Sequence, residues 1–241
     1  MRAEPIRYDC DTLCGTWPAR AELDFRPEAV RAKLTAAGIE TGLVCSGRGA
    51  WFDDIDGNTE TLAAGPGFVP VGTINLRHAL RAEAELDRIR AAGVRAVRLF
   101  GPLQGCEPVF PGYRHVVDEV LARGLLPLVE GDIRSCWPAF ADRGARVVFL
   151  DVHAYHLADF VLLARREPGF VASTRLLNAP DSIETVVGEV GAGHLTFGSR
   201  TPLHDTSPAV LRMRHARLSD ADWAAVTGGT LEALLKNRVK P

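Results

Sequence analysis

The chain lacks the features that mark several large classes of protein. No apolar run in its 241 residues reaches the roughly 18 residues that a membrane span needs. The opening residues, MRAEPIRYD, have no apolar stretch behind their charges, so we expect no secretory signal and a cytoplasmic protein. A net charge of −2 leaves no excess of either sign that would recruit nucleic acid or a membrane surface.

Cysteine is scarce, scattered and odd in number. The five residues are Cys10, Cys14, Cys45, Cys106 and Cys136, and no two of them form a CxxC pair. A disulfide framework is therefore a poor fit, and we expect reduced, mostly buried thiols. A dinucleotide fingerprint is also missing, because CDTLCGTW after the first expected strand is not GxGxxG.

What the chain does contain is a regular alternation of short apolar runs and longer helical patterns. The apolar runs predict strands over 6–10, 41–46, 68–75, 95–100, 125–131, 146–152, 170–174 and 194–199. Helical patterns lie between them, including 78–93 and 136–144, and two more close the chain around 207–216 and 219–236. Eight such units predict a parallel sheet that closes into a (β/α)8 TIM barrel, an α/β fold. We expect a single domain over 1–241.

In such a barrel the active site forms at the carboxyl ends of the strands. Four expected strand ends carry ionisable residues and a fifth contributes an arginine: Asp9, Asp11, Arg98, Glu130, Asp132, Asp151, His153, His156, Arg200, His204 and Asp205. The expected ends of the second, third and seventh strands carry only small or neutral residues. We therefore expect a polar pocket to which the seventh strand contributes no charge.

Several of these residues have a structural reading beside the functional one. Asp9 and Asp132 fit turn or N-cap positions, which acids after a strand often occupy. Arg98, between Val97 and Leu99, points into the barrel if its neighbours point out, and there it needs an acidic partner. Arg200 is well placed to bind an anion, and it is equally well placed to form a salt bridge that closes the barrel mouth.

Over nearly its whole length the chain resembles the amidohydrolase superfamily, specifically the amidohydrolase-related group of compact metal-dependent hydrolases. YDCDTLCGTWP at 8–18 is similar to the group's IDxHxHxGxWP, and GEVGAGHLTFGSRTPLHD at 188–205 to ELGxDRIxFGSDxPF. Residues 58–75, 91–132 and 226–235 resemble three further motifs of the group, in the same order. The resemblance implies a TIM barrel and hydrolytic activity.

The same comparison implies that the family's metal ligands are replaced here. Its ligand positions fall, in chain order, on Asp11, Leu13, Glu130 or a neighbour, Asp151 and Arg200. Leu13 cannot coordinate a metal, and the guanidinium of Arg200 repels a dication. Three carboxylates facing Arg98 and Arg200 balance their charges without a metal, so we expect neither a metal nor another cofactor.

We therefore expect a metal-independent enzyme that acts on a small carboxylated or carbonyl-containing molecule by acid/base catalysis. The predicted catalytic residues are Asp11, Glu130, Asp151 and His153, and the predicted substrate-binding residues are Arg98, Arg200, Asp132 and His204. Lactone or amide opening fits the family, and elimination or isomerisation fits the residues as well.

Two alternatives stay open. One is a non-catalytic barrel that binds a small ligand or a partner protein. The other is a metal-dependent hydrolase with a rewired, carboxylate-rich site. The expected partner is a small-molecule substrate, not nucleic acid or a membrane, and a homo-oligomer is compatible with the sequence.

Overall fold

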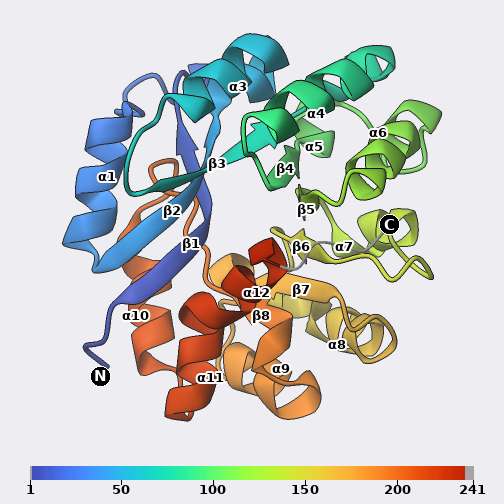
Figure 1. Cartoon of the computed structure of the whole chain (residues 1–241). Coiled ribbons are helices and arrows are strands. Elements are labelled where there is room, and N and C mark those ends of the chain that lie inside the picture. The colour runs from blue at the N-terminus through green and yellow to red at the C-terminus, as the bar shows by residue number, and fades with distance from the viewer. Residues whose placement is uncertain (1, 237–241) are drawn as a thin grey trace.

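Eight parallel strands follow one another around a nearly closed barrel in the computed structural model, which describes residues 2–236 (Figure 1). The strands are β1 (Ile6–Cys14), β2 (Ile39–Ser46), β3 (Phe68–Thr73), β4 (Ala96–Leu99), β5 (Leu126–Val129), β6 (Val147–Phe149), β7 (Phe170–Ser173) and β8 (Leu195–Thr196). The Cys10 N–H donates to the Phe197 carbonyl and the Leu13 N–H to the Thr201 carbonyl, each at 2.9 Å. These bonds join β1 to the segment that directly follows β8. The predicted TIM barrel is confirmed.

Helices cover the outside of the barrel. They are α1 (Pro27–Ala36), α2 (Gly47–Trp51), α3 (Asp54–Leu62), α4 (Ala82–Ala91), α5 (Gly101–Gln104), α6 (Pro111–Ala122), α7 (Ile133–Cys136), α8 (Leu157–Arg166), α9 (Ser182–Val190), α10 (Thr206–His215), α11 (Asp220–Ala224) and α12 (Thr230–Lys236). Proline occupies the first turn of α1 and of α6, where its missing N–H costs no hydrogen bond. Side-chain oxygens of Ser46 and Asp53 cap α2 and α3.

One predicted helix is wrong. The pattern over 136–144 forms only the end of the four-residue α7 and a single 3-10 turn, Trp137–Ala139. Pro138 has no N–H to donate to a preceding carbonyl, so a helix that runs through it loses a hydrogen bond. The pattern over 219–236 is also interrupted, because a wider turn over Ala225–Gly229 separates α11 from α12.

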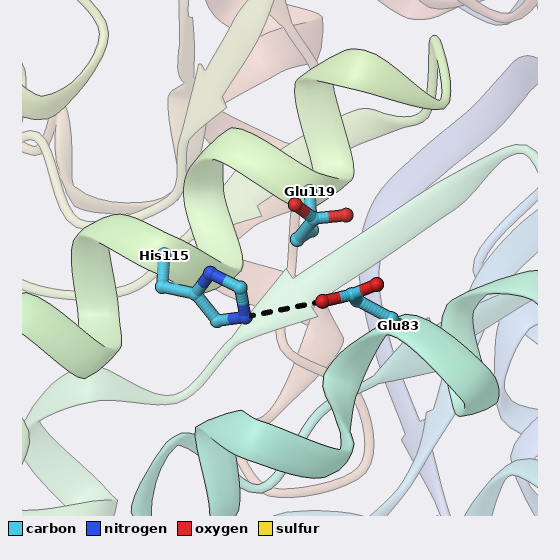
Figure 2. Close-up of side chains that lie close together, drawn as sticks. All are labelled: Glu83, His115 and Glu119. Atoms are coloured by element: carbon cyan, nitrogen blue, oxygen red, sulfur yellow. Dashed lines mark ion pairs between the residues drawn. The ribbon is translucent and has the colours of Figure 1, made fainter.

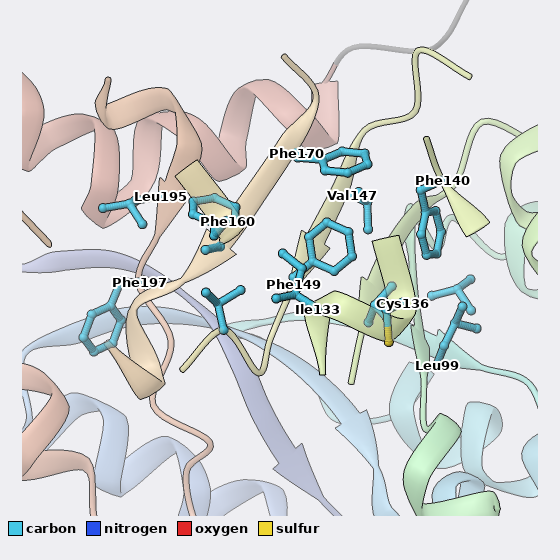
Figure 3. Packing of buried hydrophobic residues seen from close by; sticks show 14 of the residues in the cluster. Leu99, Ile133, Cys136, Phe140, Val147, Phe149, Phe160, Phe170, Leu195 and Phe197 are labelled. Carbon is cyan, nitrogen blue, oxygen red and sulfur yellow. The ribbon is translucent and has the colours of Figure 1, made fainter. Parts of the chain in front are cut away.

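On the central strands β4 and β6, alternate residues face two different apolar cores. On β4, Val97 and Leu99 pack in the outer core under the helices, whereas Ala96 packs in the barrel interior. The outer core is rich in aromatic rings: the Phe149 centroid lies 5.1 Å from that of Phe170 and 6.0 Å from that of Phe140 (Figure 3). The alternation directs the side chain of Arg98 into the barrel, as its neighbours predict.

The helices of the described residues are short. The longest, α6, has 12 residues, and none of those between residues 2 and 236 combines the length and apolar character that crossing a bilayer demands. Residues 237–241, the end of the predicted domain 1–241, lie outside the described residues.

Candidate active site

An irregularity in β1 brings the first acid into the barrel. Asp9 lies opposite Gly42 and Thr12 lies opposite Val44, so β1 has one more residue than β2 over this stretch. Such a bulge changes the direction of the side chains near it. The carboxylate of Asp11 is fully buried, with Oδ1 2.7 Å from Arg98 Nη2 and Oδ2 2.9 Å from Arg175 Nε.

Asp11 belongs to a closed ring of six alternating charges, which we call the charge ring: Asp11, Arg98, Glu130, Arg200, Asp151 and Arg175. Arg98 Nη2 lies 2.6 Å from Glu130 Oε1, and Arg200 Nη2 lies 2.9 Å from Glu130 Oε2. Arg200 Nη1 lies 3.4 Å from Asp151 Oδ1, which Arg175 Nη2 also contacts. Each acid therefore pairs with two arginines, and each arginine with two acids.

Solvent reaches the two sides of the ring unequally. The side chains of Asp11, Arg98 and Glu130, which we call the sealed arc, are at most 5% exposed. The side chains of Arg200 and Asp151, the mouth arc, are 11% and 19% exposed. A ligand that enters from solvent therefore meets the mouth arc first.

The arginines keep the acids of the sealed arc ionised. Burial raises the pKa of Asp11, but the charges of Arg98, Arg175 and Arg200 outweigh it and bring that pKa to about 2. Burial also opposes ionisation of Glu130, yet Arg200 and Arg98 hold its pKa below the ordinary value. A carboxylate with so low a pKa is a weak base near neutral pH, which disfavours the acid/base role predicted for these two residues.

Arg175 is the member of the ring that the sequence analysis missed. The seventh strand was expected to contribute no charge to the pocket, but the turn after it does. β7 ends at Ser173, and Arg175 follows in the 3-10 turn Thr174–Leu176, where the period of two along a strand no longer applies. The available signal was an arginine directly after the expected strand end at residue 174. Arg212 Nη1 holds the turn by donating to the carbonyls of Thr174 and Arg175, at 3.1 and 3.0 Å.

His204 lies at the surface beside the mouth arc. Its backbone N–H donates to the carbonyl of Arg200 at 3.1 Å. Partial burial lowers the pKa of His204, and the positive charges of Arg175 and Arg200 lower it further. The imidazole is therefore neutral near pH 7, the form that accepts a proton.

The structure does not bring Asp132 and His153 into the ring. Asp132 caps α7 by accepting the Arg134 N–H at 2.9 Å, which confirms its N-cap reading. The ring of His153 stacks on Tyr155, with centroids 4.7 Å apart, and burial followed by the charge of His156 lowers the pKa of His153. His156 Nδ1 lies 3.6 Å from Asp132 Oδ1. These residues form a second polar group on the loops after β5 and β6.

Asp9 is not the turn residue that the sequence suggested. It lies within β1, because the strand continues to Cys14, and its carboxyl group is fully buried. It accepts hydrogen bonds from the backbone N–H groups of Asp11, at 2.9 Å, and Ser199, at 3.0 Å, and from the Ser199 hydroxyl. Burial raises the pKa of Asp9 to about 7 against the effect of these bonds.

The charge ring does not fit a metal ion. Carboxylate oxygens of Asp11, Glu130 and Asp151 are the donors a hard cation would need. Guanidinium nitrogens already contact the oxygens of all three, and three arginines neutralise three acids. A dication placed among them would meet positive charge on every side.

Among residues 2–236, a single group of at least three His, Cys, Asp or Glu residues has its ligand atoms within 4.8 Å of one another, and it is not part of the charge ring. It consists of Glu83 on α4 and His115 and Glu119 on α6 (Figure 2). His115 Nε2 lies 3.9 Å from Glu83 Oε1, and Glu119 also pairs with Arg123. The group sits on the outer helices, not at the strand ends where the charge ring lies.

Comparison with known proteins identifies the fold. No protein-family model and no curated protein matches the chain. Among solved structures it is similar to 5-carboxyvanillate decarboxylase from Sphingomonas paucimobilis (TM-score 0.70, 14% identity, 96% of this chain and 99% of that one). It is also similar to a 2,6-dihydroxybenzoate decarboxylase (TM-score 0.73, 12% identity, 98% and 100% covered). A third is a Pseudomonas putida protein with the proposed name 2-pyrone-4,6-dicarboxylic acid hydrolase (TM-score 0.70, 16% identity, 97% and 98% covered). At these identities the likeness shows a shared barrel fold.

Proposed function

We propose that this chain is a divergent member of the amidohydrolase superfamily that acts, without a metal, on a small molecule bearing a carboxylate. The observation that carries the proposal is the position of the weakest contact in the charge ring. The pair of Arg200 and Asp151 is the longest, at 3.4 Å, and its two side chains are the most exposed of the ring. A ligand carboxylate can replace Asp151 there without disturbing the sealed arc.

Arg200 supplies the binding charge in this proposal. A guanidinium pairs with a carboxylate through two parallel N–H bonds, and such charge-assisted bonds are strong where water is excluded. Asp151 keeps other partners when the ligand arrives, because Arg175 contacts its Oδ1 and the Gly131 N–H donates to its Oδ2 at 2.9 Å. The exchange therefore leaves no buried acid without a partner.

His204 is the group best suited to move a proton. In hydrolysis of a lactone or amide, the neutral imidazole takes a proton from water as the water oxygen adds to the carbonyl carbon. Arg200 and Arg175 face the oxyanion that forms. The C–O or C–N bond then breaks, and the imidazolium returns its proton to the leaving oxygen or nitrogen. Elimination or isomerisation needs the same base, which then takes the proton from a carbon atom of the substrate. We also propose that His153 and Asp132 contact the end of the substrate that lies farther from Arg200.

The names of the similar structures support the substrate class. Two are decarboxylases of aromatic carboxylates, and the third carries the name of a dicarboxylic acid hydrolase. Superfamily membership rests on this shared barrel together with the motifs of the sequence. The lack of a metal rests on the guanidiniums that contact the acids.

A second candidate follows from the completeness of the pairing. Because every acid of the ring contacts two arginines, the ring can also serve as a structural closure of the barrel mouth. The protein would then be a non-catalytic barrel. Binding of a carboxylate at Arg200 separates the two candidates.

The first experiment is elemental analysis of the purified protein before and after a chelator, followed by calorimetric titration with benzoate, phthalate and pyrone carboxylates. We expect less than a tenth of an equivalent of metal and carboxylate binding that Arg200→Met weakens at least tenfold. Arg166→Met, at an exposed position on α8, is the matched control. A stoichiometric metal that survives purification contradicts metal independence. A metal-free, folded protein that binds no carboxylate and opens no lactone supports the second candidate.

A further inference from the structure

We propose that Asp9 is a positioning residue that fixes the guanidinium of Arg200 at the barrel mouth. The effect of Asp9 on the backbone around Arg200 does not depend on the proposed function, whereas its consequence for carboxylate binding rests on that function. Asp9 is fully buried, and among the described residues its carboxyl oxygens bond to N–H and O–H groups of Asp11 and Ser199. It therefore acts through the backbone and not by touching a substrate.

Asp9 contacts Ser199, one neighbour of Arg200 in the chain, and through Ser199 it is linked to the other neighbour, Thr201. Its Oδ1 accepts the Ser199 N–H at 3.0 Å, and its Oδ2 accepts the Ser199 hydroxyl. The Ser199 oxygen in turn accepts the Thr201 N–H at 3.1 Å and lies 2.6 Å from the Thr201 hydroxyl oxygen. Arg200 is thus held between Ser199, which bonds to the buried carboxyl group of Asp9, and Thr201, which bonds to the Ser199 hydroxyl.

The backbone of Arg200 needs this support. Its φ is +64°, in the left-handed region that non-glycine residues rarely adopt. Such a conformation persists when the surrounding contacts leave the chain no alternative. Besides the bonds to Asp9, the Leu13 N–H donates to the Thr201 carbonyl at 2.9 Å. Both sides of the strained residue are therefore tied to β1.

The same carboxyl group links the two arcs of the charge ring. Oδ1 of Asp9 accepts the N–H of Asp11, a sealed-arc residue, at 2.9 Å as well as the N–H of Ser199. The segment approaches β1 closely at Gly198, where an added Cβ would lie 3.3 Å from Asp11 Cβ and 2.2 Å from Ser173 Oγ. Asp9 thus sets where Arg200 lies relative to Asp11, on the other side of the ring.

The test follows the side-chain Nε–H signals of the arginines by ¹⁵N NMR, with the Arg200 signal assigned by its loss in Arg200→Lys. In Asp9→Ala we expect the Arg200 signal to shift and its hydrogen exchange to accelerate at least tenfold, while the Arg98 signal stays in place. Asp9→Asn, which keeps an acceptor oxygen, restores most of the protection. Thr185→Ala removes an exposed helical hydroxyl and is the control that leaves both signals unchanged.

Ser199→Ala tests the same link if Asp9→Ala fails to fold, because it removes the hydroxyl that connects Asp9 to Thr201. An unchanged Arg200 signal in folded Asp9→Ala or Ser199→Ala overturns the proposal.

Titration with phthalate distinguishes the two proposals. A shifted Arg200 signal in a protein that binds no carboxylate keeps Asp9 as a positioning residue and refutes the proposed function. Equal phthalate affinity in wild type and Asp9→Ala, with an unmoved Arg200 signal, refutes the positioning role and keeps the function.

Discussion

The sealed arc and the mouth arc of the charge ring have the same chemistry and different surroundings. Both consist of carboxylates paired with guanidiniums, but the side chains of Asp11 and Arg98 are at most 1% exposed whereas that of Asp151 is 19% exposed. In the sealed arc a lost partner leaves a buried charge that water cannot reach. In the mouth arc water or a ligand takes the partner's place. On this difference rests the proposal that the sealed arc serves stability and the mouth arc serves binding.

The largest loss of stability is expected from a substitution of Arg98 in the sealed arc. Arg98→Met removes a partner from both Asp11 and Glu130, so we expect the free energy of unfolding to fall by about 3–5 kcal/mol. Urea denaturation followed by circular dichroism measures the change. A loss below about 1 kcal/mol would show that the sealed arc is hydrated and would remove the contrast between the arcs.

The pH dependence of stability provides a second test of the difference between the two arcs. The folded-state pKa of Asp11 is about 2, below the ordinary value of 3.8, so its contribution to stability is present above about pH 4 and lost as the pH falls toward 2. We expect this single group to account for about 2 kcal/mol of the loss between pH 5 and pH 2. Urea denaturation at the two pH values, in wild type and in Asp11→Asn, measures it. An equal acid sensitivity of the two proteins contradicts the assignment.

The mouth arc should tolerate the same kind of change better. Arg200→Met leaves Asp151 paired with Arg175 and partly open to water, and it leaves buried Glu130 paired with Arg98, so we expect a loss of about 1–2 kcal/mol. Denaturation beside Arg98→Met measures the ratio of the two effects. If Arg200→Met destabilises the protein as much as Arg98→Met, the mouth arc is structural too.

The smallest effect is expected outside the ring. His115→Ala removes a half-buried side chain of α6 that faces α4, with its Nε2 3.9 Å from Oε1 of the exposed residue Glu83. Surface substitutions of this kind change stability by less than about 0.5 kcal/mol. Thermal denaturation of the variant measures this. A loss of 2 kcal/mol or more would show that the group of Glu83, His115 and Glu119 carries structural weight comparable to that of the ring.

Much of this arrangement could be predicted from the sequence because strands have a period of two. Alternation directed Arg98 into the barrel, and the carboxyl ends of the strands supplied Asp11, Glu130, Asp151 and Arg200. Arg175 lies beyond the end of β7, in the 3-10 turn Thr174–Leu176, so the alternation along the strand did not place it in the ring.

Other features depend on the fold alone. The bulge in β1 shifts the register by one residue between Asp9 and Thr12, and no local sequence pattern predicts it. The bond between Asp9 and Ser199 joins residues 190 positions apart, so only the closure of the barrel reveals it. The helix predicted over 136–144 failed because the interruption at Pro138 outweighed the apolar pattern around it.

The left-handed backbone at Arg200 has a consequence for how the site can evolve. Asparagine and aspartate enter that region more readily than arginine does, since their short polar side chains bond locally. Arg200→Asp would therefore relax the backbone, and it would also give the charge ring four acids and two arginines. The resulting net charge of −2 is what one divalent cation cancels. We expect this single substitution, at a position whose backbone already suits aspartate, to turn a ring that repels a cation into one that attracts it, so one residue separates the two electrostatic states.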